Sequence, residues 1–191
     1  MNSALLLWSV SRALAGDLHF APQSVVTFHN GSTLGDFSGT AQIAGFVDPV
    51  ARRGMLDIPT ASLSTGSGPR DARMLAYCLE VPRFPTIHFA VTTITGDVAA
   101  LKAGGPAGTV TLVGALTIRD VTRTISVPAS FAYDATGLKL SGRYDLLWGD
   151  FGIPDPSVVI ATLAPEMYVS FDIVAATSVG AAGDVAPVGK P

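Results

Sequence analysis

Few side chains in this 191-residue chain have the type and spacing that catalysis needs. Its three histidines, His19, His29 and His88, are scattered, and its one cysteine, Cys78, lies among apolar residues. The sequence contains no CxxC, HExxH, GxSxG, phosphate-loop or dinucleotide-binding pattern. A metal site needs several converging ligands, and no spacing of Asp, His or Cys demands one. We therefore interpret each histidine as a surface or strand-face residue and Cys78 as a small buried hydrophobe.

One polar pair could serve a binding site. Arg70 and Asp71 follow a Gly-Pro pair at residues 68–69, where proline suits the first position of a helix and an acidic residue suits its first turn. The pair could cap the helix or form a solvated rim, or it could gate a cavity and bind the polar head of a ligand. An enzyme using Asp57 or His88 inside an apolar cavity is an alternative, but no nucleophile–base pair supports it.

The elements that would position these residues are one helix and a series of strands. Met74, Leu75, Cys78 and Leu79 recur at helical spacing after the Gly-Pro pair, and Pro82 prevents the helix from continuing. This helix is too short to be stable alone, so its apolar stripe must rest on the strands. Residues 99–108 are rich in Gly, Ala and Pro and are expected to form a loop.

Strict alternation of apolar and polar residues dominates the rest of the chain. It is clearest over residues 110–118, 125–133, 138–148 and 167–173. Such a pattern indicates antiparallel strands with one buried face. About eight strands at short spacing predict a sandwich or a closed barrel, and an eight-stranded barrel can hold side chains or one small ligand. We predict an all-β fold, an eight-stranded antiparallel β-barrel with one short helix.

The apolar residues that this pattern turns inward are the candidate lining of a ligand site. Periodicity alone favours a filled core, because most apolar stripes are core. The hydrophobic fraction of 48% is nevertheless more than a small barrel needs to fill itself. The candidates are Phe37, Leu75, Phe89, Leu116, Ile118, Phe131, Leu146, Trp148 and Phe171, to which Arg70 and Asp71 are added at the start of the helix.

Charge and the two ends of the chain limit the class of protein. The net charge of −3 and the lack of a Lys/Arg cluster do not indicate a surface that binds nucleic acid or an anionic membrane. Residues 1–16 hold a short apolar run and an Ala-Leu-Ala sequence like a signal-peptidase site, but no positive start, so we expect a signal peptide or an N-terminal extension. The barrel domain is expected at 17–175 and a disordered tail at 176–191.

Four segments, taken in order, resemble the YceI-like family of lipocalin-like polyisoprenoid-binding proteins. They are residues 62–66 with 70–72 (SLSTG and RDA), 82–89 (PRFPTIHF), 111–123 (TLVGALTIRDVTR) and 150–153 (DFGI). The resemblance spans residues 18–174. The chain departs from the family pattern at Asp120, where glycine is common, and at residues 77–81, so the helix residues that face a ligand are not assumed to be equivalent.

The resemblance implies a lipocalin-like barrel that holds an isoprenoid lipid, either a polyprenyl or a quinone-like chain, for transport, storage or stress protection. It implies a periplasmic or secreted protein that is not an enzyme and needs no cofactor besides the lipid. Peripheral contact with a membrane is compatible with this function, and the sequence leaves open a monomer or a homodimer. A module with a solid core and no ligand is the remaining alternative.

Overall fold

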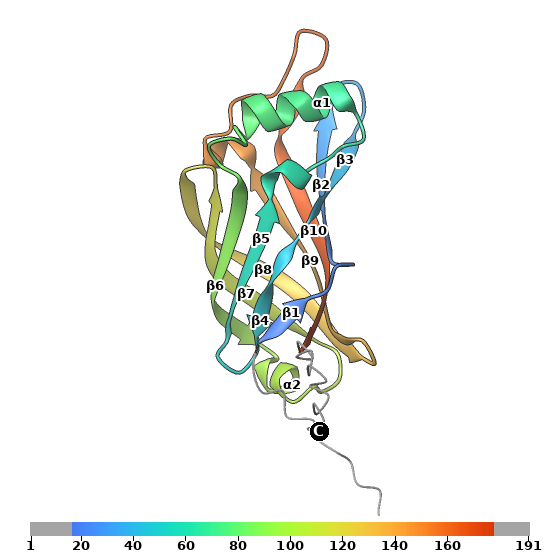
Figure 1. Cartoon of the computed structure of the whole chain (residues 1–191), viewed down its shortest axis with the longest axis vertical. Helices are drawn as coiled ribbons and strands as arrows, with labels where there is room; N and C mark the ends of the chain where they lie inside the picture. Colours follow the sequence, from blue (N-terminus) through green and yellow to red (C-terminus); the bar gives the residue numbers. More distant parts are fainter. Residues whose placement is uncertain (1–16, 178–191) are drawn as a thin grey trace, which may run out of the picture.

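Residues 17–177 are the part of the chain that the computed structural model describes, and most of them lie in strands (Figure 1). The strands are β1 (Leu18–Phe20), β2 (Val25–Ser32), β3 (Phe37–Gln42), β4 (Ala44–Asp48), β5 (Arg53–Pro59), β6 (Thr86–Gly96), β7 (Gly108–Ile118), β8 (Val121–Asp134), β9 (Gly137–Leu147) and β10 (Leu163–Thr177). The helical segments are η1 (Thr60–Ser62), α1 (Gly68–Arg73), η2 (Met74–Cys78), α2 (Val98–Lys102) and η3 (Trp148–Phe151).

Ten strands occupy eight positions around a closed antiparallel barrel. β1 and β2 both pair with β10, and a turn at residues 21–24 containing Pro22 separates them. β3 and β4 are likewise two parts of one position, separated at Ile43. β1 closes the ring at one end by pairing with both β4 and β10. At the other end, reciprocal hydrogen bonds of 2.8 and 2.9 Å between Thr40 and Ser64 join β3 to the segment after β5. The predicted eight-stranded barrel is confirmed.

The predicted alternation is present in the strands. In β8, Ile125, Val127, Ala129 and Phe131 are buried, and the residues between them are exposed. Successive side chains of a strand point to opposite faces, so this pattern directs the apolar set into the barrel and leaves the polar set in water.

α2 lies at one end of the barrel (Figure 1), and the apolar side chains of that end, including Ile94, Leu101 and Leu138, are packed together in one buried cluster. Val98 and Leu101 of α2 are buried, and the Tyr133 hydroxyl donates a 2.7 Å hydrogen bond to the Leu101 carbonyl. Burial raises the pKa of Tyr133 to about 12. The prediction that residues 99–108 are all loop is therefore wrong. A helix of little more than one turn is too short for periodicity to reveal.

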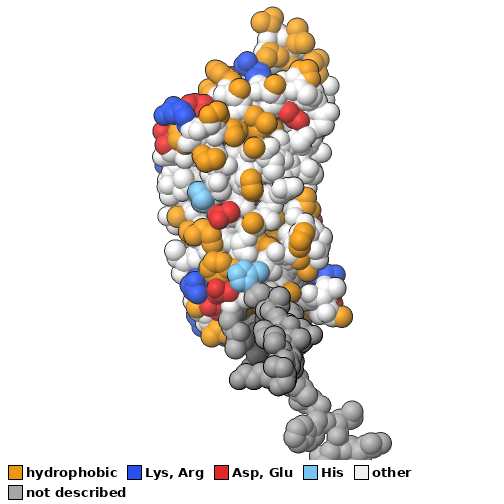
Figure 2. All heavy atoms as spheres, viewed as in Figure 1, with side chains coloured by type: hydrophobic (Ala, Val, Ile, Leu, Met, Phe, Trp, Pro, Cys, Tyr) orange, Lys and Arg blue, Asp and Glu red, His pale blue; other side chains and the backbone are white. Residues whose placement is uncertain are grey.

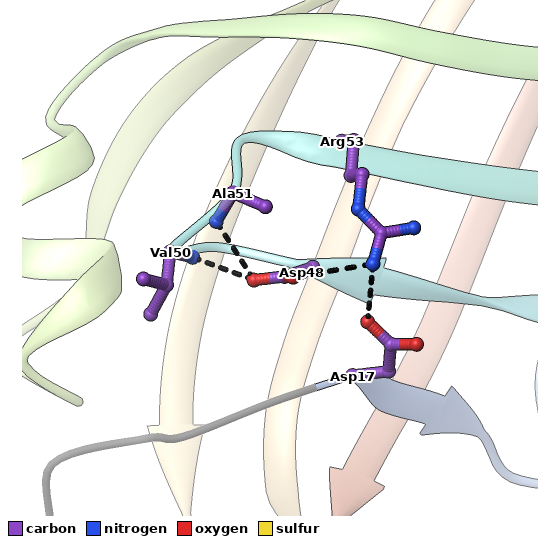
Figure 3. A network of polar contacts seen from close by, with 5 residues as sticks. All are labelled: Asp17, Asp48, Val50, Ala51 and Arg53. Atoms are coloured by element: carbon purple, nitrogen blue, oxygen red, sulfur yellow. Dashed lines mark hydrogen bonds and ion pairs between the residues drawn. The ribbon is translucent and has the colours of Figure 1, made fainter.

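The same end is fastened by a polar network (Figure 3). Arg53 Nη2 lies 3.3 Å from Asp17 Oδ1 and 3.6 Å from Asp48 Oδ2. Asp48 Oδ1 accepts hydrogen bonds of 2.9 and 2.8 Å from the amides of Val50 and Ala51. Asp48 thus holds the β4–β5 turn, and Arg53 connects that turn to the start of β1.

The last strand is longer than the sequence pattern indicated. β10 runs to Thr177 and pairs with β1 over its final three residues, so residues 176 and 177, which the sequence analysis assigned to the tail, belong to this strand. Ala175 and Ala176 give no apolar–polar contrast, although Ala175 is fully buried. Residues 1–16, predicted as a signal peptide or extension, and 178–191 lie outside the described residues.

The opposite end carries α1 and η2, which lie across the strand ends (Figure 1). A second apolar cluster forms beneath them, around Cys78, Leu79, Ile118, Leu146 and Phe151. Within residues 17–177, no helix has the length and apolar character needed to cross a membrane.

Candidate ligand-binding cavity

A cavity of about 640 Å³ occupies the half of the barrel nearest α1. Its walls are inward-facing residues of β2, β3 and β5–β10, and almost all of them are apolar. Residues of the α2 end, such as Ile94, Leu101 and Leu138, are fully buried in the packed cluster and do not line it. The barrel is therefore solid at one end and hollow at the other.

The mouth of the cavity lies beneath α1. The Arg70 guanidinium lies 4.2 Å from the centre of the Phe37 ring, and both residues line the cavity. Arg73, Asp36 and Ser67 complete a polar margin around the apolar interior. A cation over an aromatic face is favourable, so this pair holds the margin of β3 against α1.

Asp71 fixes the start of α1. Its Oδ1 accepts hydrogen bonds of 2.8 Å from the Thr65 amide and 2.6 Å from the Thr65 hydroxyl, and its Oδ2 accepts one of 2.7 Å from the Ser64 hydroxyl. These bonds to Thr65 and Ser64 lower the pKa of Asp71. Because Ser64 also bonds to Thr40 of β3, the carboxylate anchors the helix to the barrel wall.

The last turn of the helical segment forms the roof. η2 is a π-helix, in which each turn is wider by about one residue than in an α-helix. Met74, Cys78 and Leu79 line the cavity in this geometry. Burial of Cys78 raises the pKa of its thiol, despite the opposing charges of Arg73 and Arg119. Cys78 is thus a buried apolar wall residue, as the sequence indicated.

An ion-pair cluster holds the end of η2. Glu80 pairs with both Arg119 and Arg83, and Arg119 Nη1 donates a 2.6 Å hydrogen bond to the Gly152 carbonyl. Glu80 and Arg119 both have positive φ, at 46° and 57°. Arg119 thereby connects the roof to the β7–β8 turn and to the residue after η3. Sequence reasoning missed this connection, because the two partners are 39 residues apart.

Asn30 is a further polar residue of the cavity wall that sequence reasoning missed. It lines the cavity on β2, is only 8% exposed, and its Oδ1 has no hydrogen-bond partner. Buried polar atoms normally have a partner, so an unpaired amide oxygen in the wall of an apolar cavity is unusual and makes Asn30 a candidate binding residue. In the sequence it follows Phe28 by two residues, and nothing in that pattern indicated a binding residue.

The residues of the enzymatic alternative lie elsewhere. His88 Nδ1 is 2.7 Å from Asp57 Oδ1, and the two side chains are 50% and 41% exposed. Neither residue lines the cavity. Among residues 17–177, no group of three or more His, Cys, Asp or Glu side chains is placed to hold a metal ion.

The arrangement is therefore an apolar chamber with a polar margin, and comparison with known proteins gives its family. A family model described as the YceI-like domain matches residues 16–175. The chain belongs to the YceI-like family. No curated protein compared with the chain matches it.

Solved structures similar to this YceI-like barrel come from several bacteria. A polyisoprenoid binding domain from Saccharophagus degradans is 17% identical, covers 84% of this chain and 97% of its own, and has a TM-score of 0.70. BcnA from Burkholderia cenocepacia is 20% identical, with coverages of 80% and 96% and a TM-score of 0.64. The Campylobacter jejuni YceI protein is 18% identical, with coverages of 71% and 80% and a TM-score of 0.53. At these identities the likeness establishes the fold.

The YceI-like barrel brings eight of the eleven predicted site residues to the cavity. These are Phe37, Arg70, Phe89, Leu116, Ile118, Leu146, Trp148 and Phe171. Their role as ligand contacts stays a prediction, but they form one continuous surface.

The other three predicted residues lie outside the lining. Asp71 bonds to Ser64 and Thr65. Leu75 is partly buried but does not line the cavity, whereas Met74, Cys78 and Leu79 of the same π-helical segment and its end do. Phe131 is 2% exposed and packs in the closed half, with its ring edge-on to Tyr133 at 6.5 Å.

Proposed function

We propose that this protein binds an isoprenoid lipid in its barrel without transforming it. The observation that supports the proposal most is the apolar chamber of about 640 Å³, which is within the roughly 300–1,000 Å³ of ligand sites. An isoprenoid tail is long and apolar, so it needs shape and an apolar wall more than a catalytic group. Each methylene moved from water into such a wall contributes about 0.8 kcal/mol.

Two comparisons agree with this function. The family model is the YceI-like domain, and one similar solved structure is described as a polyisoprenoid binding domain. The exposed position of Asp57 and His88 argues against an enzyme that would use them inside the barrel.

The finer proposal concerns the polar end of the ligand. A polyprenol hydroxyl can donate to the unpaired Asn30 Oδ1, and a quinone carbonyl can accept from an Asn30 amide hydrogen, since an amide carries both functions. We place the head near Asn30 and the margin formed by Asp36 and Arg70, with the tail toward Leu116 and Phe171. A periplasmic or secreted carrier, storage protein or protective protein is compatible with such a site.

Native mass spectrometry of the full chain, followed by solvent extraction, tests the proposal. We expect one apolar molecule per chain, with species that differ by whole isoprene units. The same spectrum distinguishes a monomer from a homodimer. A clean protein mass that does not change after incubation with a polyprenol or an isoprenoid quinone would contradict the proposal and favour a module without a ligand.

A further inference from the structure

A tight apolar hairpin projects beyond the mouth of the barrel. It connects η3 to β10, and Figure 1 shows it rising past α1 in the orange part of the chain. Val158 and Ala161 pair through hydrogen bonds of 2.9 and 3.0 Å, which leaves Val159 and Ile160 as the two residues of the turn. Val159 is fully exposed, and Ile160 is 77% exposed. Turn positions normally hold Gly, Asn, Asp, Pro or Ser, so two β-branched aliphatic residues are unusual there.

A third aliphatic side chain joins this tip. Leu34, in the β2–β3 connection, is 71% exposed. The hydroxyl of the neighbouring Thr33 accepts a 3.1 Å hydrogen bond from the Thr162 amide. The Thr33 backbone amide donates a 3.0 Å hydrogen bond to the Thr162 carbonyl. Leu34 therefore lies beside the base of the hairpin. We call Leu34, Val158, Val159 and Ile160 the apolar apex; the space-filling view shows hydrophobic side chains at this end of the molecule (Figure 2).

The hairpin is anchored at its base. Arg73 of α1 donates hydrogen bonds of 3.2 Å to the carbonyls of Pro156 and Ser157. The Ser157 amide donates to Asp155, and the Ser157 hydroxyl accepts from the Leu163 amide at 2.9 Å. An exposed apolar tip on a fixed base is a rigid projection, so burying it costs little conformational entropy.

The apolar apex is continuous with the cavity. Leu34 and Val158 are exposed at the apex and also line the chamber. An apolar chain leaving the cavity at this side would remain in contact with aliphatic carbon as far as the tip.

We propose that the apolar apex inserts into the surface of a phospholipid bilayer and so places the mouth of the cavity against the membrane. A small convex aliphatic tip fits the acyl-chain boundary of a bilayer, whereas protein partners typically bury Trp, Tyr or Arg anchors in pockets. Charges near the apex have both signs, Arg70 and Arg73 beside Asp36 and Asp155, so attraction to anionic lipid is not the driving force. The idea that an isoprenoid lipid passes from the membrane into the cavity rests on the proposed function. The insertion of the apolar apex into the bilayer does not depend on it.

Vesicle sedimentation with the full chain tests the insertion. The test variant is Val159→Ser/Ile160→Ser, which removes apolar surface without adding charge. The matched control is Val50→Ser, because Val50 is an aliphatic residue that is 50% exposed in the β4–β5 turn (Figure 3), and this turn lies at the α2 end of the barrel, opposite the apex (Figure 1). We expect binding of the wild type to phosphatidylcholine vesicles to fall about tenfold or more in the double variant and to be unchanged in the control. High salt should have little effect.

Several results would overturn the proposal. The wild type could fail to bind vesicles, or the double variant and the control could lose binding equally. Binding could require anionic lipid and disappear in salt, which would indicate a charged surface. A tip-dependent change in oligomeric mass without vesicle binding would indicate a contact between copies of the chain. Native mass spectrometry with detergent-dispersed polyprenol separates the two proposals: a double variant that keeps the ligand but loses vesicles locates its defect at the membrane.

Discussion

Replacing Leu116 with tryptophan tests whether the hollow half of the barrel receives the ligand. Leu116 is on β7 beside Phe89 of β6, and it is only partly buried although it faces inward. It packs against the main apolar cluster and also against the cluster beneath α1 and η2, so it lies in the chamber wall just below the roof. A tryptophan side chain has six more heavy atoms than leucine, and they must enter the space that the proposed tail occupies.

The expected effect follows from that count. Six atoms of ligand displaced at about 0.3 kcal/mol each weaken binding by about 2 kcal/mol, or about twentyfold in Kd. In a hollow site the free energy of unfolding of the empty protein should change by no more than about 0.5 kcal/mol. In a packed core the same substitution would cost about 1–3 kcal/mol.

Two assays and one control separate these outcomes. Urea unfolding gives the stability of the empty protein, and native mass spectrometry during titration with a polyprenol gives the affinity. Thr117→Trp is the matched control, because Thr117 is the next residue of β7 and its hydroxyl is on the outer face, 2.9 Å from that of Thr122. Lower stability of Leu116→Trp with unchanged lipid binding would refute the reasoning, and so would a stable variant that binds lipid as tightly as the wild type.

Three further predictions concern the polar groups and the thiol. Asn30→Leu removes an unpaired buried amide, so we expect the empty protein to gain about 1–3 kcal/mol in urea unfolding and to lose its preference for a polyprenol over a hydrocarbon of equal length. Cys78 should react slowly with a thiol reagent in the folded protein and more slowly when lipid is bound, because burial raises its pKa and it lines the cavity; a rate independent of lipid would contradict this. Hydrogen bonds from Thr65 and Ser64 lower the pKa of Asp71 below its usual 3.8, so this carboxylate stabilises the fold above that pH and the contribution disappears as pH falls through the lowered value. The difference in unfolding free energy between wild type and Asp71→Asn should therefore be present at neutral pH and vanish in strong acid.

Side-chain alternation could predict the direction of a residue but not its height in the barrel. Leu116 and Phe131 have the same period-2 context, and both face inward as predicted. Leu116 lines the chamber, whereas Phe131 fills the closed end beside Tyr133. The difference depends on how far along the axis each residue lies and on which helix covers that end. No local pattern contains this information, so the sequence left a filled core and a cavity as alternatives.

The helical segments show a second limit. The Gly-Pro pair and the apolar stripe correctly predicted a helix that rests on the strands, but an α-helical period placed Leu75 with Met74 on its inner face. The π-helical turn changes which residues lie inward, and it depends on how the chain is held at Glu80, whose partner Arg119 is 39 residues away. Such long-range ion pairs cannot be read from spacing.

The closed and open ends together determine how a ligand can move. Because the α2 end is packed, the described part of the barrel gives an apolar chain access only from the side covered by α1 and η2. That cover is fastened at its start by Asp71 and at its end by Glu80 and Arg119. Neither fastening point contributes an apolar surface to the chamber. Residues that hold the cover should therefore control how fast a ligand is exchanged, whereas residues of the wall, such as Leu116, should control how tightly it is bound.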